Sequence, residues 1–179
     1  LVFQGKVFRT AGSLYPRVDG WAVSTYEMGE DRTIRPNGDH PPREHQLLDL
    51  EIRDDGGLRL FCAAASAGLE SSDRRLHTGL IGTLALRVLQ AAVAVSDKTD
   101  YQGAWAFGLA LRGHGTVSIG QGVIRGFVDR RIDVYDETVN ASMEELRTRP
   151  DEIARSLLTR LYRAFGFLDH VPGLPGPNN

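Results

Sequence analysis

The chain has 179 residues, of which 41% are hydrophobic and 25% charged, and its formal net charge is −2 at pH 7. These values are typical of a globular protein long enough to bury a core. They argue against a strongly basic nucleic-acid surface, although a local basic patch stays compatible with them. The single cysteine, Cys62, excludes an internal disulfide and suits a reducing compartment.

The most apolar stretch runs from Leu76 to Val95 and is interrupted by Thr78, Thr83, Arg87 and Gln90. No uninterrupted apolar run therefore reaches the roughly 20 residues that span a bilayer. We expect a cytoplasmic protein with no membrane partner. Arg greatly outnumbers Lys, which is typical of a GC-rich genome and indicates a bacterial source.

Three segments are expected along the chain. Leu1 to Gly5 lacks an initiator Met and resembles the remnant of a protease-cleaved affinity tag, so it is excluded from fold reasoning. Residues 6–171 are expected to form a single domain. Residues 172–179 are rich in Pro and Gly and are expected to be a flexible tail.

The first part of the chain predicts four strands. Gly20 to Met28 alternates in polarity, and a turn leads from it into a second strand over Arg32 to Arg35. Gln46 to Arg53 and Leu58 to Ala65 flank Asp54 to Gly57, whose glycines supply the positive φ of a tight hairpin turn. This hairpin places its leucines on one face and its carboxylates on the other.

A long apolar helix is expected over Asp73 to Val95, with Ser72 or Asp73 as its N-cap. From Leu76 onward its only charge is Arg87, which predicts burial on more than one side.

The segment Gly103 to Arg112 alternates large apolar residues with Ala and Gly. A strand that is apolar on both faces is typical of a central strand covered on both sides. The glycine-rich segment Gly113 to Gly126 is expected to be a long loop with room for a short strand. Arg131 to Val139 is expected to be a further strand.

Two helices are expected near the end of the chain. Ser142 to Glu145 fits a capping box, with Ser at the cap and Glu three residues later. Pro150 suits the first turn of the second helix. The order ββββ-α-ββ-αα predicts an α+β fold, in which an antiparallel sheet of about six strands packs with the long apolar helix and the C-terminal helix.

Asp49, Glu51 and Asp55 are candidate metal ligands on the predicted hairpin. Two carboxylates on one strand face, followed by a cation, resemble the arrangement in metal-dependent nucleases. The nuclease pattern usually has Lys where this chain has Arg53. The polar outer face of an antiparallel hairpin explains the same residues without a metal.

Other chemistry-bearing patterns have simpler explanations. The histidines between Asp39 and His45 are separated by two prolines and are expected in a solvated loop. Gly113 to Gly122 is not followed by Gly-Lys-Ser/Thr, which argues against a phosphate-binding loop. His114 and Ser118 lack a recognisable nucleophile elbow. No catalytic residue and no cofactor are therefore assigned.

The candidate ligand-binding residues are aromatic or basic. Two tryptophans can stack on a base or sugar, although Trp on an alternating strand is more often part of a core. A small arginine cluster can bind phosphate, although nearby carboxylates balance it. The candidates are Trp21, Trp105, His114, Arg125, Arg130 and Arg131.

Three stretches have a pattern known from one family: Leu14-Tyr15-Pro16 with Gly20-Trp21, Tyr101-x-Gly103-x-Trp105-x-Phe107-Gly108, and Leu109-x-Leu111-Arg112-Gly113. Over about residues 14 to 165 the chain resembles the C-terminal accessory region of actinobacterial Schlafen/AlbA-like proteins, which are described as DNA-binding or ATP-binding. The acidic motif of that family's N-terminal domain does not occur here. The resemblance implies an attached module and carries over no catalytic residue.

The sequence thus favours a non-enzymatic binding, sensor or assembly domain of a larger bacterial protein. Its expected partners are another protein or the other domains of its parent chain, and a homo-oligomer is a further expectation. The alternative is a metal-dependent nucleic-acid-processing enzyme that uses Asp49, Glu51 and Asp55. Nucleic acid stays a possible partner, but the net charge does not favour it.

Overall fold

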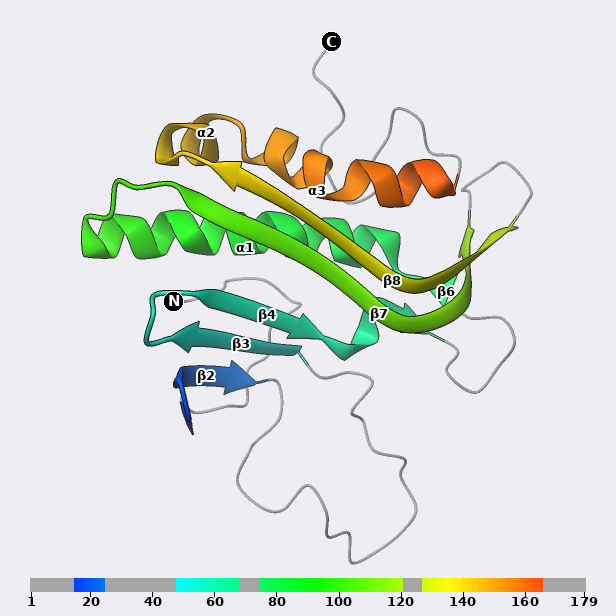
Figure 1. Ribbon diagram of the computed structural model, residues 1–179, viewed down its shortest axis with the longest axis horizontal. Helices are drawn as coiled ribbons and strands as arrows, with labels where there is room; N and C mark the ends of the chain where they lie inside the picture. Colours follow the sequence, from blue (N-terminus) through cyan, green and yellow to red (C-terminus); the bar gives the residue numbers. More distant parts are fainter. Residues whose placement is uncertain (1–14, 25–47, 68–74, 121–126, 166–179) are drawn as a thin grey trace, which may run out of the picture. The chain divides into compact units, whose positions relative to one another are not determined.

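The computed structural model describes residues 15–24, 48–67, 75–120 and 127–165 (Figure 1). The chain forms two compact units, Leu1–Ala64 and Ala65–Asn179. The expectation of a single domain over residues 6–171 stays a prediction.

The first unit is an antiparallel sheet with strand order β1-β2-β3-β4. Its strands are β1 Tyr15–Arg17, β2 Gly20–Ser24, β3 Leu48–Arg53 and β4 Leu58–Cys62. The predicted β3–β4 hairpin is confirmed, with Leu50 opposite Leu60. The strand expected at Arg32 to Arg35 lies outside the described residues.

The sequence did not predict β1, which has only three residues and contains Pro16. Such a segment lacks the alternating run that identifies a strand. Arg17 at its end pairs with Gly20 of β2, whose φ is +153°. A Cβ atom there would stand 2.1 Å from the Ile52 carbonyl oxygen, so the close approach of β2 to β3 requires glycine.

The two faces of this sheet differ in chemistry. The register aligns Trp21, Ile52 and Leu58 in one row across three strands, and these side chains share the apolar face. Asp49 and Glu51 lie on the opposite face, as the alternation of β3 predicts.

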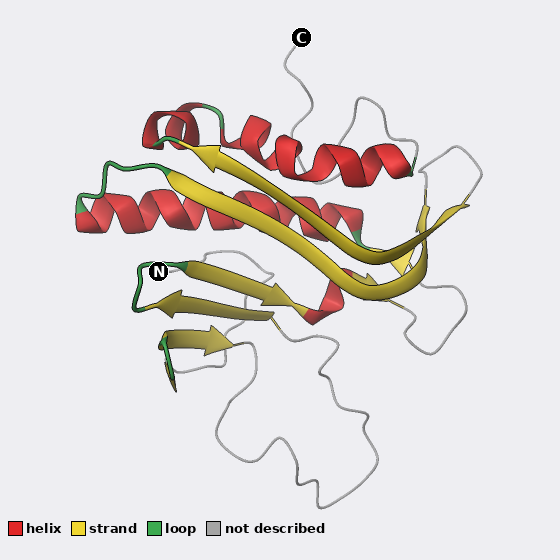
Figure 2. Cartoon of the chain, in the orientation of Figure 1, coloured by secondary structure: helices red, strands yellow, loops and turns green. Residues whose placement is uncertain are grey.

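Among the described residues, the second unit combines a mixed sheet with α-helices (Figure 2). After a 3-10 turn at Ala63–Ala65, its strands are ordered β5-β6-β7-β8. The elements in chain order are β5 Ser66–Ala67, β6 Arg75–Leu76, α1 Thr78–Thr99, β7 Trp105–Gly120, β8 Phe127–Ala141, α2 Met143–Thr148 and α3 Pro150–Ala164.

The α+β class and the order ββββ-α-ββ-αα are confirmed for the main elements. The strands form two sheets instead of one, and the pairing of β6 with β7 is parallel. The long helix begins at Thr78, not at Asp73, because Arg75 and Leu76 form β6. His77 is its N-cap residue and makes no side-chain capping hydrogen bond, so the expected Ser72 or Asp73 cap is wrong.

The strand predicted at Gly103 to Arg112 is much longer in the structure. β7 continues to Gly120, so most of the predicted glycine-rich loop is strand, and it pairs with β8 in a long hairpin. A register shift between Arg112 and Gly115 marks a bulge in this hairpin. The glycines accommodate that irregularity, because bulges favour residues without a Cβ atom.

Helices α1 and α3 pack against one face of the β7–β8 hairpin. On the α3 side, the Tyr135 hydroxyl donates to the Leu157 carbonyl oxygen at 2.5 Å. On the α1 side, the Trp105 indole Nε1 donates to the Ser96 hydroxyl at 3.0 Å. The two helices also contact one another, and the Tyr162 hydroxyl donates to the Thr78 carbonyl oxygen at 2.7 Å. The fully buried centre of this unit is formed by Leu89, Ala92, Ala154, Leu158, Tyr162 and Phe165.

Helix α1 is the one helix in the described ranges that is long and apolar enough to cross a membrane. The polar residues that interrupt the stretch from Leu76 to Val95 had argued against such a span. A helix in the core of a soluble protein passes the same test of length and composition. Within this unit α1 contacts α3 and β7.

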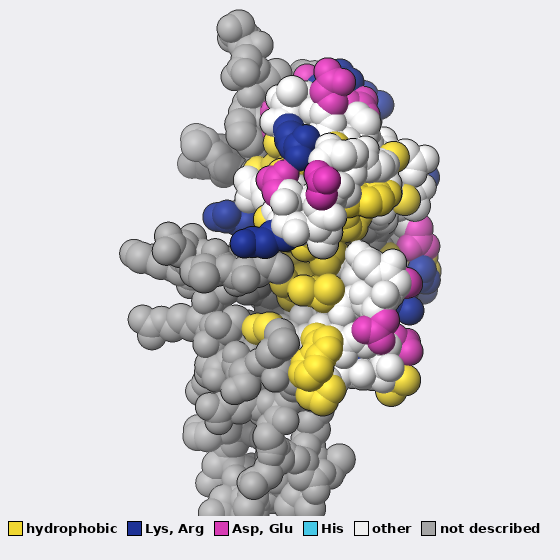
Figure 3. All heavy atoms as spheres, turned by 90° about the vertical axis from the view of Figure 1, so that its left-hand side faces the viewer, with side chains coloured by type: hydrophobic (Ala, Val, Ile, Leu, Met, Phe, Trp, Pro, Cys, Tyr) yellow, Lys and Arg dark blue, Asp and Glu magenta, His cyan; other side chains and the backbone are white. Residues whose placement is uncertain are grey.

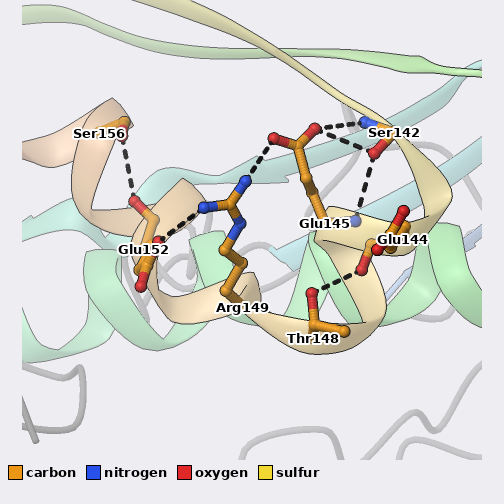
Figure 4. Close-up of polar contacts among 7 residues, drawn as sticks. All are labelled: Ser142, Glu144, Glu145, Thr148, Arg149, Glu152 and Ser156. Carbon is orange, nitrogen blue, oxygen red and sulfur yellow. Dashed lines mark hydrogen bonds and ion pairs between the residues drawn. The ribbon is translucent and has the colours of Figure 1, made fainter.

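The predicted capping box is confirmed at the start of α2 (Figure 4). The Ser142 hydroxyl accepts from the Glu145 backbone N–H at 3.2 Å, and the Glu145 carboxylate accepts from the Ser142 backbone N–H at 2.9 Å. The Ser142 hydroxyl also donates to the Glu145 carboxylate at 3.0 Å. The hydrogen bonds from the Ser142 backbone N–H and from its hydroxyl favour the charged carboxylate and lower the pKa of Glu145 below its usual value. Pro150 occupies the first turn of α3, as predicted.

Candidate functional site

The candidate functional site is the edge of β7 between Trp105 and Arg112. Along this stretch β7 pairs with β8 on one side. On its other side, the pairing found in the described residues is a single bridge between Arg75 and Ser118, beyond the bulge. Half of the backbone N–H and C=O groups of a strand point toward each neighbour. In the described part of the chain, those on this edge have no paired strand.

The side chains of this stretch divide sharply by size. Phe107 and Leu111 are buried at 7% and 6% exposure, and Trp105 and Leu109 on the same face are half-buried. Ala106, Gly108 and Ala110 face the other way and are exposed. The expectation that this strand is covered on both sides is therefore wrong. Small apolar residues remain on the uncovered face, where alternation in a half-buried sheet normally places polar ones.

The inward face of β7 is fixed at its start by an aromatic cluster. The Trp105 ring stacks with Phe107 at 6.2 Å between centroids, and Tyr101 contacts it edge-on at 5.8 Å. The Trp105 indole also donates to Ser96, which is fully buried. These contacts fix the orientation of Trp105 at the start of β7.

The β8 side of the hairpin is held by polar contacts to α3. The Arg160 guanidinium lies over the Tyr135 ring at 5.2 Å and pairs with Glu137 at 3.1 Å. Burial raises the pKa of the Tyr135 hydroxyl above its usual value, and the nearby Glu137 carboxylate raises it further. A phenol that stays protonated and donates to the Leu157 carbonyl oxygen serves structure, not acid–base chemistry at neutral pH.

The described residues include several exposed apolar side chains besides the small ones of β7. Trp21 is 50% exposed, Tyr101 44% and Val134 58%. Figure 3 shows that some hydrophobic side chains of the described residues are open to solvent. Val134 lies on β8 directly opposite Arg112, on the same outer face as Ala106 and Gly108.

Trp105 does not form one site with Arg131. Trp21 lies in the first unit, whereas Trp105 begins the hairpin of the second unit. Trp105 pairs with Ala141, and Arg131 lies ten positions earlier on β8, about 33 Å along an extended strand. Trp105 packs inward, so its aromatic face serves the core of the hairpin.

The remaining candidates are dispersed or lie beyond what the structure describes. Arg131 is exposed and pairs with Asp133 at 2.8 Å. His114 and Arg130 belong to β7 and β8, and their side chains fall outside the described part. Arg125 lies outside the described residues altogether.

The structure does not bring Asp49, Glu51 and Asp55 together as a metal site. The Asp49 carboxylate is bound by the Arg17 guanidinium at 2.7 Å, and Glu51 pairs with Arg59 at 3.9 Å. Asp55 lies in the hairpin turn, where its carboxylate accepts from the Gly57 backbone N–H at 2.9 Å. No group of three potential metal-binding side chains occurs among the residues described.

The chain matches no family model, and no curated protein or solved structure is significantly similar to it. The resemblance to Schlafen/AlbA-like accessory regions therefore stays a prediction.

The sequence did not predict an open edge at β7, because this strand is apolar on both of its faces. That pattern is typical of a central strand, and neighbours on both sides were inferred from it. The size difference between its faces was visible in the sequence, but only the structure shows that the small face is exposed.

Proposed function

We propose that the chain is a non-enzymatic binding and assembly module whose β7 edge accepts a β-strand from a protein partner. The observation that carries this proposal is the stretch from Trp105 to Leu111, which has no charge and no proline and no paired strand on its outer side among the described residues. Strand addition uses such an edge, because backbone hydrogen bonds supply affinity and alternate side chains supply selectivity.

The chemistry of the edge supports a protein partner over a nucleic acid. Nucleic-acid binding requires basic groups that neutralise phosphates. The exposed positions of this stretch are Ala106, Gly108 and Ala110, and the nearest arginine, Arg112, is already paired with Asp136 at 3.0 Å. An uncharged edge instead favours a strand that brings its own apolar side chains.

A peptide tests the proposal directly. The probe is a synthetic copy of residues 104–112 with two lysines added for solubility, and the control is the same peptide with proline at its centre, which removes a backbone donor. We expect a saturable change in the backbone amide signals of β7 with the probe and none with the control. Equal effects of the two peptides, or no change in β7, would overturn the proposal.

The alternative, a metal-dependent nucleic-acid enzyme, gains no specific support from the carboxylates of β3. They are bound by arginines, which leaves fewer oxygens for a metal ion. We expect no change in Tm with Mg²⁺ or Mn²⁺. A metal-dependent rise in Tm that Asp49→Asn abolishes would favour the enzyme instead, because a ligand that binds the folded state raises stability.

A further inference from the structure

We infer that the strand bound at the β7 edge is β7 of a second copy of this chain, paired antiparallel about a two-fold axis at Gly108. This inference rests on the proposed function and names its partner. A two-fold interface must be self-complementary, because the same residues meet from both sides. The sequence of β7 meets that requirement.

The requirement is met residue by residue between Trp105 and Leu111. With Gly108 opposite its own copy, Ala106 lies opposite Ala110, Phe107 opposite Leu109, and Trp105 opposite Leu111. Directly opposed residues share a face, so large residues meet large ones and small residues meet small ones. The pattern Trp-Ala-Phe-Gly-Leu-Ala-Leu is thus symmetric in residue size about its centre.

Gly108 is favoured as the centre because it aligns the whole apolar stretch with itself. A centre at Phe107 would place Leu111 opposite Gly103, and a centre at Leu109 would place Trp105 opposite Gly113. Either register leaves a large side chain without an apolar partner. A centre halfway between two residues would place the large face of one copy beside the small face of the other, because strand faces alternate.

The second copy would also cover surface that the single chain leaves open. Phe107 and Leu111 are already buried, but Trp105 and Leu109 are only half-buried on the same face. In the proposed register they contact Leu111 and Phe107 of the other copy. At the end of the paired stretch Arg112 lies opposite Ala104, so no like charges meet across the interface.

The size of this contact predicts a reversible dimer. Stable interfaces bury about 800 Å² on each partner, and a pair of seven-residue strand edges provides less than that. We therefore expect a dissociation constant in roughly the micromolar range. The dimer would then form and dissociate with chain concentration.

Sedimentation velocity of the full chain over a range of concentrations tests the inference. We expect the weight-average mass to rise from monomer toward dimer. Gly108→Asp should abolish this rise, because it places two carboxylates opposite one another at the axis. The monomer can accept a side chain there, since a Cβ atom at Gly108 would meet only the Thr138 methyl group, at 3.9 Å.

Ala106→Asp is the matched control. It adds the same charge to the same exposed face, but in the proposed register it meets neutral Ala110 of the other copy. We expect a weaker effect than that of Gly108→Asp, with unchanged circular dichroism in both variants. Equal effects of the two variants would overturn the Gly108 axis.

A charge pair tests the register further. Ala106→Glu combined with Ala110→Lys creates two attractive contacts across the axis, whereas Ala106→Lys combined with Ala110→Lys creates two repulsive ones. We expect the first double variant to dimerise about tenfold more tightly than the second. Equal dissociation constants would contradict the register.

Two negative results separate this inference from the proposed function. If the chain stays monomeric at every concentration but the peptide of residues 104–112 still binds β7, the edge accepts a strand and only the pairing of two folded copies is overturned. If the chain is monomeric and the peptide does not bind, both proposals fall.

Discussion

The edge strands of the first sheet differ in chemistry from the open side of β7 in the second sheet. In the first unit, the edge strand β1 has three residues, one of them Pro16, and the edge strand β4 carries Arg59, which is 66% exposed. In the second unit, β7 runs from Trp105 to Leu111 with neither charge nor proline. Short length, proline and charge protect sheet edges against unwanted pairing. The first sheet uses these devices, and the β7 edge uses none.

This contrast indicates that the β7 edge is used for pairing with a partner. An unprotected apolar edge is an aggregation hazard unless a partner covers it in a defined way. The core beneath β7 is ordered by the aromatic cluster and by the Trp105–Ser96 hydrogen bond, so the edge is part of a well-packed unit. We therefore interpret it as a pairing surface, and the variants below test the parts of this comparison.

The largest loss of stability is expected from Leu89→Ala, which removes a buried side chain from the helical core beneath β7. Leu89 is fully buried on α1, and its truncation leaves a cavity. We expect a loss of about 2–5 kcal/mol in the free energy of unfolding, measured in urea. Gln90→Ala on the exposed side of the same helix is the control, with a change within about 0.5 kcal/mol. Similar effects of the two variants would show that α1 is not the core of this unit.

The next effect is expected in the first sheet, from Arg17→Ala. The Arg17 guanidinium binds Asp49, whose carboxylate is nearly buried. Hydrogen bonds to charged groups contribute about 1.5–3 kcal/mol. Arg53→Ala is the control, because its ion pairs are longer, at 3.7 Å, and exposed. A loss no larger than the control's would show that the charged face does not secure this sheet.

Tyr162→Phe tests how α3 is joined to α1. It removes the hydrogen bond to the Thr78 carbonyl oxygen, and we expect a loss of about 1 kcal/mol at neutral pH. Burial raises the pKa of Tyr162 above its unfolded value near 10. The folded state thus holds the proton more tightly, and stability should fall as the pH rises above about 10. The variant should lose part of this alkaline decline, and an identical decline in both proteins would contradict the account.

Ser142→Ala tests the capping box that orients α2 after β8. Loss of an N-cap hydroxyl costs about 1 kcal/mol. Ser156→Ala is the control, because that hydroxyl donates to the Glu152 carbonyl oxygen within α3 and caps nothing (Figure 4). Since the pKa of Glu145 is lowered, its contribution is present above its usual pKa near 4.5 and is lost as the pH falls below it. The acid decline should be shallower in Ser142→Ala than in the control.

The elements of the fold that depend on a few neighbouring residues were predicted well from the sequence. The β3–β4 hairpin followed from Asp54 to Gly57, and the α2 capping box followed from Ser142 and Glu145. The predicted start of α1 at Asp73 was wrong because Arg75 and Leu76 pair with residues of other strands. No local sequence pattern reveals such pairing.

The candidate site depends more than these elements on pairing between strands that are far apart in the sequence. The sequence identified the apolar alternation from Trp105 to Leu111 but could not tell how many neighbours the strand has. The pattern shows which faces of the strand are apolar, but strand pairing uses backbone groups in the plane of the sheet, which side-chain alternation does not report. The tryptophan and arginine candidates were chosen by residue type, and the hairpin separates Trp105 from Arg131.

Backbone amide hydrogen exchange of Trp105 to Leu111, compared between dilute and concentrated solutions of the full chain, tests the central claim most directly. The amides that point toward β8 should be protected at both concentrations. The alternate amides, which point away from β8, should exchange rapidly when dilute and become protected when concentrated. Exchange at these alternate amides that does not change with concentration would contradict pairing of the β7 edge with a second copy.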